Sequence, residues 1–160
     1  MRLLLCCVGR LKAGPERELV ARYIERAAAA GPALGFAKVA LREVAESRAA
    51  RAADRKREEA RALCGLWPPD AAIIAFDESG RPVTSRDFAA VLARLRDEGR
   101  GCAALAIGGP DGLDESLVAA VPLGLSLGPM TWPHQLARIM AAEQMYRAIT
   151  ILAKHPYHRD

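Results

Sequence analysis

Residues 71–76 read Ala-Ala-Ile-Ile-Ala-Phe, a short apolar run that lies between Pro69-Asp70 and Asp77. An uninterrupted apolar run of this length, with turn residues on both sides, is typical of a strand buried on both faces, as in a parallel sheet. Comparable runs occur outward along the chain at residues 2–8, 36–44, 103–107 and 123–127. We therefore expect a sheet of about five strands.

The segments between these runs have helical patterns. We expect helices over Pro15–Ala30, Ser47–Leu63, Ser85–Glu98 and Asp114–Val121, and a long final helix with Pro133 as its first residue. Thr84 and Asp87 have the spacing of a capping box, and Gly99 is a typical helix stop. Strands that alternate with helices favour a single α/β domain over residues 1–160, with a mostly parallel sheet and flanking helices.

The final helix is expected to present a broad apolar face. Its apolar residues at helical spacing are Leu136, Ile139, Met140, Met145, Tyr146, Ile149 and Leu152.

The composition is that of a globular protein: 51% of the residues are hydrophobic but only 5% are aromatic, so aliphatic side chains must fill the core. No apolar run approaches the ~20 residues that a membrane span needs, and the opening run is too short for a signal sequence. We expect a cytoplasmic protein that does not bind membranes. The four cysteines have no CxxC spacing, which predicts buried free thiols and no metal site.

The charge is unevenly distributed along the chain. Residues 1–61 carry 14 Lys and Arg against 8 Asp and Glu, a net charge of +6, in a chain whose total net charge is +4. A basic half of this kind can attract a phosphate backbone. Residues 47–63 carry both positive and negative side chains at helical spacing, however, which is typical of a helix face exposed to solvent. Charge alone favours the second interpretation.

Three segments follow predicted strands, and ligands of open parallel sheets bind beyond the carboxyl ends of strands. These segments are Phe76-Asp77, Gly108–Gly112 and Leu127–Trp132. The glycines of the second allow close approach to a ligand, but they also suit an ordinary turn, and the motif is neither a dinucleotide fingerprint nor a P-loop. The third could hold a planar base through its backbone, or form a tight connection between a strand and a helix.

All three histidines lie near the carboxyl end of the sequence. His134 stands at the start of the final helix, where the helix dipole favours a neutral imidazole that could bind substrate or accept a proton, or could simply cap the helix. His155 and His158 lack a third ligand for a metal. Tyr157 and Arg159 suit base stacking and the binding of phosphate or carbonyl groups.

Taken together, these stretches resemble the small SPOUT-class methyltransferases of the ribosomal RNA large subunit methyltransferase H family, which methylate N3 of a pseudouridine in 23S rRNA. The matching stretches are Cys7–Lys12, DESGRPVTSRDFA at 77–89, AIGGPDGL at 106–113, LSLGPMTWPHQLARIMAAEQMYRA at 125–148 and the final HPYHRD. They cover the chain from end to end, and the block at the carboxyl end is the specific one.

The resemblance implies a C-terminal trefoil knot that binds S-adenosylmethionine, and a homodimer. It assigns the cofactor pocket to Phe76, Gly108, Leu127, Gly128, Pro129, Met130, Thr131 and Trp132. Gly128 replaces a more usual Ser, and Trp132 replaces Phe or Leu, which should change local packing.

The resemblance also motivates roles in catalysis. We expect His158 or His134 to remove the N3 proton or to hydrogen-bond the base, Arg159 to hold a carbonyl oxygen and Tyr157 to stack on or position the base. The tail, residues 155–160, would close over the target base. Since the chain has no appended RNA-binding domain, the expected substrate is large-subunit rRNA within the ribosome.

Other functions remain open on the sequence. The first alternative is a non-catalytic ribosome-binding or RNA-binding factor of the same fold. The second is a related methyltransferase that acts on tRNA or on a protein. A metal-dependent hydrolase ranks last, for want of ligands.

Overall fold

A five-stranded parallel sheet forms the centre of the computed structural model, which describes residues 1–157. The strands are β1 (Arg2–Val8), β2 (Lys38–Val44), β3 (Ala72–Pro82), β4 (Cys102–Ile107) and β5 (Leu123–Ser126). Their order in the sheet is β2-β1-β4-β3-β5, and every neighbouring pair is parallel. The central strand β4 is buried at all six positions, as expected for a strand covered on both faces.

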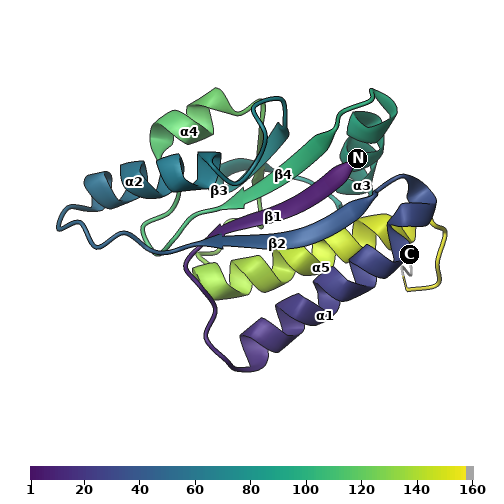
Figure 1. The fold of residues 1–160 in the computed structure, drawn as a ribbon, viewed down its shortest axis with the longest axis horizontal. Coiled ribbons are helices and arrows are strands. Elements are labelled where there is room, and N and C mark those ends of the chain that lie inside the picture. The colour runs from purple at the N-terminus through teal and green to yellow at the C-terminus, as the bar shows by residue number, and fades with distance from the viewer. Residues whose placement is uncertain (158–160) are drawn as a thin grey trace.

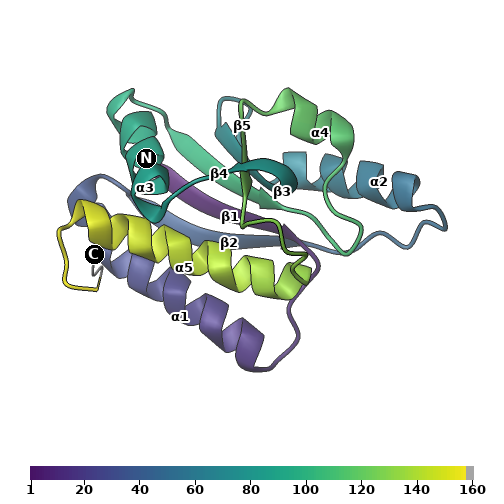
Figure 2. The ribbon, with the colours of Figure 1, turned by 180° about the vertical axis from the view of Figure 1, so that it is seen from behind.

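Helices cover both faces of this sheet (Figures 1 and 2). One face packs against α1 (Pro15–Ala30), α3 (Ser85–Asp97) and α5 (His134–Leu152), and the other lies against α2 (Ala52–Cys64) and the short α4 (Glu115–Ala120). A 3-10 turn, η1 (Pro32–Leu34), follows α1. The predicted α/β architecture is confirmed. No helix in the part of the chain described here is long and apolar enough to cross a membrane.

Strand β1 shows how the sequence divides the core into two layers. Leu3, Leu5 and Cys7 belong to the cluster under α1, α3 and α5, whereas Leu4, Cys6 and Val8 belong to the cluster on the α2 side. Successive residues of a strand point to opposite faces, so adjacent Cys6 and Cys7 lie in different layers. All four cysteines are free thiols, and Cys64 alone is exposed.

The predicted capping box at the start of α3 is confirmed. The Thr84 hydroxyl accepts a hydrogen bond from the backbone N–H of Asp87 (3.1 Å), and the Asp87 carboxylate accepts one from the backbone N–H of Thr84 (3.3 Å). The Asp87 carboxylate also accepts a hydrogen bond from the Thr84 hydroxyl (2.7 Å), and this bond, together with the one from the Thr84 N–H, holds the pKa of Asp87 below its usual value. The chain leaves the helix after Glu98 through Gly99, which has a φ of +78°.

Three predicted boundaries are wrong, two of them because of a contact distant in the sequence. Helix α2 begins at Ala52 instead of Ser47, since Ser47 folds back and bonds to Glu58 and Glu59 of that helix. Strand β3 extends beyond the predicted run of residues 71–76 to Pro82, because its last residues pair with β5 after a shift of register. Pro133 is the N-cap of α5 and not its first residue.

Helix α5 buries most of the predicted apolar face, since Met145 and Ile149 are completely buried and Ile139, Tyr146 and Leu152 pack against the core, but this face does not extend to Leu136. Leu136 is 42% exposed, whereas Ala141, Ala142, Met145, Ala148 and Ile149 are completely buried. The small alanine side chains let this helix pack closely against the sheet, between α1 and α3. The fully buried Arg138 also lies on this face, which the apolar pattern does not predict.

The capping box gives a stability test. We expect Thr84→Ala to lower the free energy of unfolding by about 1 kcal/mol, because one N-terminal N–H of α3 loses its partner. Thr84→Ser keeps the hydroxyl and is the matched control. Both variants can be measured by urea denaturation, and equal stability of the alanine and serine variants would show that the cap contributes nothing.

Candidate functional site

A cleft of about 930 Å³ lies at the carboxyl ends of β3, β4 and β5. Its walls come from the irregular part of β3 after Phe76, from the loop Gly108–Gly112 and from the segment 126–133, with His134 and Ala137 of α5 at one side. The three segments that the sequence singles out are thus brought together. Seven of the eight residues that the resemblance assigns to a cofactor line this cleft, while Pro129 lies in the same segment but does not line it.

Two backbone features make the walls of the cleft stiff. A Cβ on Gly108 would lie 2.4 Å from the carbonyl carbon of Gly112, so the loop after β4 closes on itself only with glycine at this position. After β5, the Ser126 hydroxyl donates to the carbonyl oxygen of Gly128 (3.0 Å) and accepts from its N–H (3.1 Å). The φ of Gly128 is +106°, which fits the glycine found where a serine is more usual.

The lining of the cleft combines apolar side chains with charge. Phe76, Ile107, Leu127, Met130 and Trp132 form its apolar part. Met130 and Trp132 are 70% and 39% exposed, so these large side chains are only partly covered. The titratable residues in the lining are Asp77, Glu78, Asp111, Glu115, Lys56 and His134. The ammonium group of Lys56 lies 3.6 Å from the carboxylate of Glu115.

Of the two predicted catalytic residues within residues 1–157, His134 lies in the cleft and Tyr157 does not line it. Burial lowers the pKa of the His134 imidazole, against an opposing effect of Glu46, whose carboxylate is 3.8 Å from Nε2. The positive charge of Arg138 lowers the pKa further. The imidazole is therefore neutral near pH 7 and has a nitrogen able to accept a proton, with a carboxylate nearby to stabilise the charged form.

Arg138, one turn further along α5, holds this end of the helix to the sheet. It donates from Nη1 to Glu43 at the end of β2 (2.6 Å), and from Nη2 to the carbonyl oxygens of Val8 (2.6 Å) and Gly9 (3.0 Å) after β1. Sequence reasoning missed this residue. The sequence did contain an indication of its burial. Arg138 has the helical spacing that places it on the same face of α5 as Met145 and Ile149, and this face is buried.

Tyr157 does not lie near His134. Its hydroxyl donates to Glu143 (3.1 Å), and its ring contacts Tyr146, at 4.8 Å between centroids, and Arg147, whose guanidinium lies 5.1 Å from the ring centre. Burial and the Glu143 charge raise the pKa of Tyr157 to about 12. Tyr157 thus packs against the second half of α5, and the chain just before it turns back beside the carboxyl end of this helix (Figure 2). With 19 residues, α5 is ~28 Å long. His158 and Arg159 lie outside the described residues.

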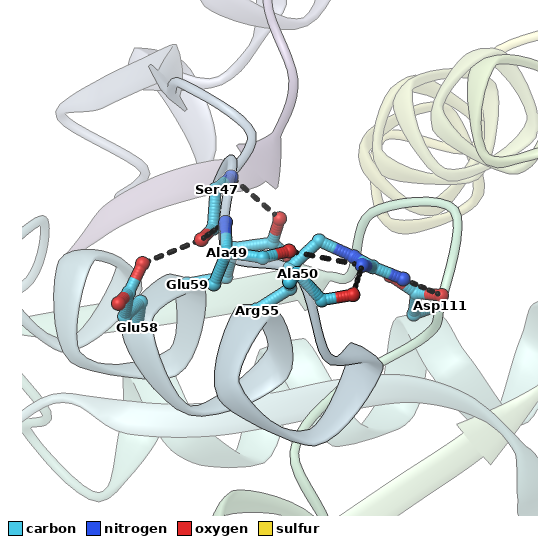
Figure 3. Close-up of polar contacts among 7 residues, drawn as sticks. All are labelled: Ser47, Ala49, Ala50, Arg55, Glu58, Glu59 and Asp111. Atoms are coloured by element: carbon cyan, nitrogen blue, oxygen red, sulfur yellow. Dashed lines mark hydrogen bonds and ion pairs between the residues drawn. The ribbon is translucent and has the colours of Figure 1, made fainter.

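Glu59 is a buried carboxylate directly behind the loop after β4 (Figure 3). The residue is 4% exposed, and Oε1 accepts a hydrogen bond from the N–H of Ser47 (2.9 Å). Oε2 has no hydrogen-bond partner in the described part of the chain, and it lies 3.1 Å from where a Cβ on Gly109 would be. Burial raises the pKa of this carboxyl group, and the nearby charges of Asp111 and Glu46 add to the effect.

This raised pKa predicts a pH-dependent stability. The ionised form of Glu59 is disfavoured in the folded state, so it destabilises the protein above the folded-state pKa, and the cost disappears as the pH falls toward the unfolded-state value. We expect Glu59→Gln to raise Tm at pH 7–8 and to lose this advantage toward pH 4–5. Glu58→Gln, at the exposed neighbour, should give no gain. A Glu59→Gln variant without higher Tm at pH 8 would contradict the assignment.

Comparison with known proteins places these features in a family. A family model described as "Predicted SPOUT methyltransferase" matches residues 1–158. The ribosomal RNA large subunit methyltransferase H of Methylocella silvestris is 62% identical over the full length of both chains. The proteins of the same name from Beijerinckia indica and Rhizobium rhizogenes are 54% and 53% identical, each over 99% of both chains. The resemblance is confirmed: this chain belongs to the SPOUT methyltransferases, among the proteins named ribosomal RNA large subunit methyltransferase H.

Proposed function

We propose that this protein transfers the methyl group of S-adenosylmethionine to N3 of a pseudouridine in the 23S rRNA of the large ribosomal subunit. The observation that carries the proposal is the convergence of the three strand-end segments on one cleft. These segments are the ones that the family resemblance assigns to the cofactor. Relatives with up to 62% identity are named as methyltransferases of large-subunit rRNA.

The chemistry of the cleft fits this cofactor. Its volume of about 930 Å³ is in the range of small-molecule sites. Apolar walls and glycine backbone that allows close approach suit a planar adenine, which the segment Leu127–Trp132 would hold together with Phe76 and Gly108. The carboxylates of Asp77 and Glu115 have the charge that suits a sulfonium and an ammonium group, and Lys56 suits a carboxylate.

The trefoil knot that the family implies is part of this proposal. Support comes from the sheet order, in which β4 and β5 lie on either side of β3. The chain after β4 and the chain after β5 therefore both pass the carboxyl end of β3, where they line the same cleft. This is the region in which a knot would hold the cofactor.

His134 is the residue we assign to proton handling within the cleft. When bound, S-adenosylmethionine supplies a methyl group already activated on sulfur, so the protein itself must orient the base and accept a proton. The neutral imidazole of His134 can take the N3 proton as the new bond between nitrogen and methyl carbon forms. Glu46, 3.8 Å away, would stabilise the imidazolium that results.

The position of Tyr157 supports a homodimer with a shared site. Tyr157 packs on Glu143, Tyr146 and Arg147, roughly two to four turns along α5 from His134, so this side chain is poorly placed to reach a base beside the His134 of its own chain. Among residues 1–157, the exposed large apolar side chains are those of Met130 and Trp132, which line the cleft, and of Leu136, which lies on α5 between the lining residues His134 and Ala137. We infer that a second copy covers these side chains and brings its own tail there, with Tyr157 and Arg159 beside the target base and His158 as the other candidate for the N3 proton.

Four exposed basic side chains support an rRNA substrate. Arg10 and Lys12 follow β1, and Arg48 and Arg51 follow β2. Because β1 and β2 are parallel neighbours, both loops lie at the edge of the sheet that holds the cleft. Positive charge at this edge would attract the phosphate backbone of rRNA. The protein would then recognise the nucleotide that it modifies by the shape of the surrounding ribosomal particle.

The direct test is to map the methyl group. Purified protein with labelled S-adenosylmethionine should methylate one pseudouridine of 23S rRNA in ribosomal particles lacking the modification, with little transfer to naked rRNA fragments. His134→Ala should reduce the single-turnover rate by about 10²- to 10⁴-fold, the usual contribution of a general base. Binding of the cofactor without any transfer would favour the non-catalytic factor, and a methylated tRNA would favour the second alternative.

Mixing two inactive variants tests the shared site. His134→Ala disables the cleft of its own chain, and Tyr157→Ala disables the tail that it lends to its partner. After subunit exchange, a mixed dimer contains one cleft with both residues intact, so we expect the mixture to recover up to about a quarter of the wild-type rate, because half of the dimers are mixed and each has one working site. A mixture as inactive as its components would contradict a tail donated by the partner.

A further inference from the structure

Arg55, near the start of α2, connects three segments of the chain (Figure 3). Its guanidinium donates to both carboxylate oxygens of Asp111, from Nε at 2.7 Å and from Nη2 at 3.0 Å. Nη1 donates to the backbone carbonyl oxygens of Ala49 and Ala50, each at 3.0 Å. This two-pronged geometry is specific to arginine, since a lysine ammonium cannot reproduce the planar fork.

The acidic partner of Arg55 belongs to the wall of the cleft. Asp111 lies in the loop Gly108–Gly112, and it is itself among the residues that line the cleft. Its side chain is 26% exposed and that of Arg55 is 28% exposed, so water screens the pair only in part. Hydrogen bonding to Arg55 holds the pKa of Asp111 below its usual range, which keeps the carboxylate charged.

The same helix touches this loop at a second point. Glu59, one turn after Arg55, lies behind Gly109, so that a side chain on Gly109 would collide with it. The loop contains three glycines, which leave its backbone more freedom than other residues would. Contacts from α2 at Asp111 and at Gly109 therefore restrict a segment that its own residues would leave mobile.

We propose that Arg55 is a positioning residue for cofactor binding, which fixes the Gly108–Gly112 loop in its binding shape through Asp111. The identity of the ligand rests on the function proposed above. Arg55 does not line the cleft and acts only through the loop, so its loss should weaken cofactor binding and leave the transfer step unchanged. The family resemblance assigns no role to Arg55.

The test compares Arg55→Ala, Arg55→Lys and Asp111→Asn with a matched control on the same helix. Arg57→Ala serves as the control, because Arg57 is 58% exposed and pairs with Asp54 of its own helix. Calorimetric titration with S-adenosylmethionine should give a Kd about tenfold higher for Arg55→Ala and for Asp111→Asn, which is within the range of coupled charged pairs. The Kd of the double variant Arg55→Ala/Asp111→Asn should be no higher than that of either single variant, and the Kd of Arg55→Lys should lie between those of wild type and Arg55→Ala.

Two further measurements separate positioning from a general loss of folding. Amide hydrogen exchange in the cofactor-free protein should become faster in the loop Gly108–Gly112 of the Arg55 variants and stay unchanged in the strands. With saturating cofactor, kcat on ribosomal particles should remain within about twofold of wild type while KM for the cofactor rises. If Arg55→Ala does not fold, Asp111→Asn removes the ion pair and one of its two acceptor oxygens while leaving the bonds to Ala49 and Ala50 in place.

The outcomes distinguish this role from the proposed function itself. A wild-type protein that binds no S-adenosylmethionine would refute the proposed function, and faster loop exchange in the variants would then still report the mechanical role of Arg55. A wild-type protein that binds and methylates normally, with Kd and loop exchange unchanged in Arg55→Ala, would overturn the positioning role alone. An equal loss in Arg57→Ala would also overturn it.

Discussion

The buried guanidinium of Arg138 is the contact on which the geometry of the cleft depends. A charge with no exposed surface is tolerated only with close partners, and here a carboxylate and two carbonyl oxygens surround it. Those partners come from the ends of two different strands, so they tie α5 to both β1 and β2, while Nε has no hydrogen-bond partner among the described residues. His134 lies one turn before Arg138 on the same helix, and the segment 126–133 leads directly into it. The contacts of Arg138 therefore fix the position of the end of α5 that forms one side of the cleft.

Each wall of the cleft is restrained by a different set of contacts. The α5 side is held by Arg138, and the segment after β5 is held by the Ser126 hydroxyl. In the glycine-rich loop after β4, the N–H of Gly112 donates a hydrogen bond to the carbonyl oxygen of Gly109 (3.0 Å), and Arg55 of α2 holds Asp111 of the same loop. Three separate parts of the fold thus converge on one small volume, each with its own means of restraint.

Much of the architecture could be predicted from the sequence, because strands buried on both faces appear as plain apolar runs and a capping box is a local signal. The meeting of three strand-end loops follows from parallel topology alone. What could not be predicted depends on contacts between distant residues: the pairing of Ser47 with α2, the second pairing of β3 with β5, and the partners of Arg138. The place of Tyr157 belongs to the same class, because its partner Glu143 is identified only by the fold.

The two-layer core also determines which thiol of this protein can react. Cys6 and Cys7 are buried on opposite faces of β1, and burial raises the pKa of each to about 12, while Cys102 is buried in β4 with a raised pKa. Thiolate is the reactive form, so these three should be nearly inert to alkylating reagents in the folded state. Cys64 is exposed at the end of α2, the helix that carries Arg55 and Glu59. The natural sequence thus offers a single attachment point for a fluorophore or spin label, and it lies on the helix that contacts the glycine-rich loop.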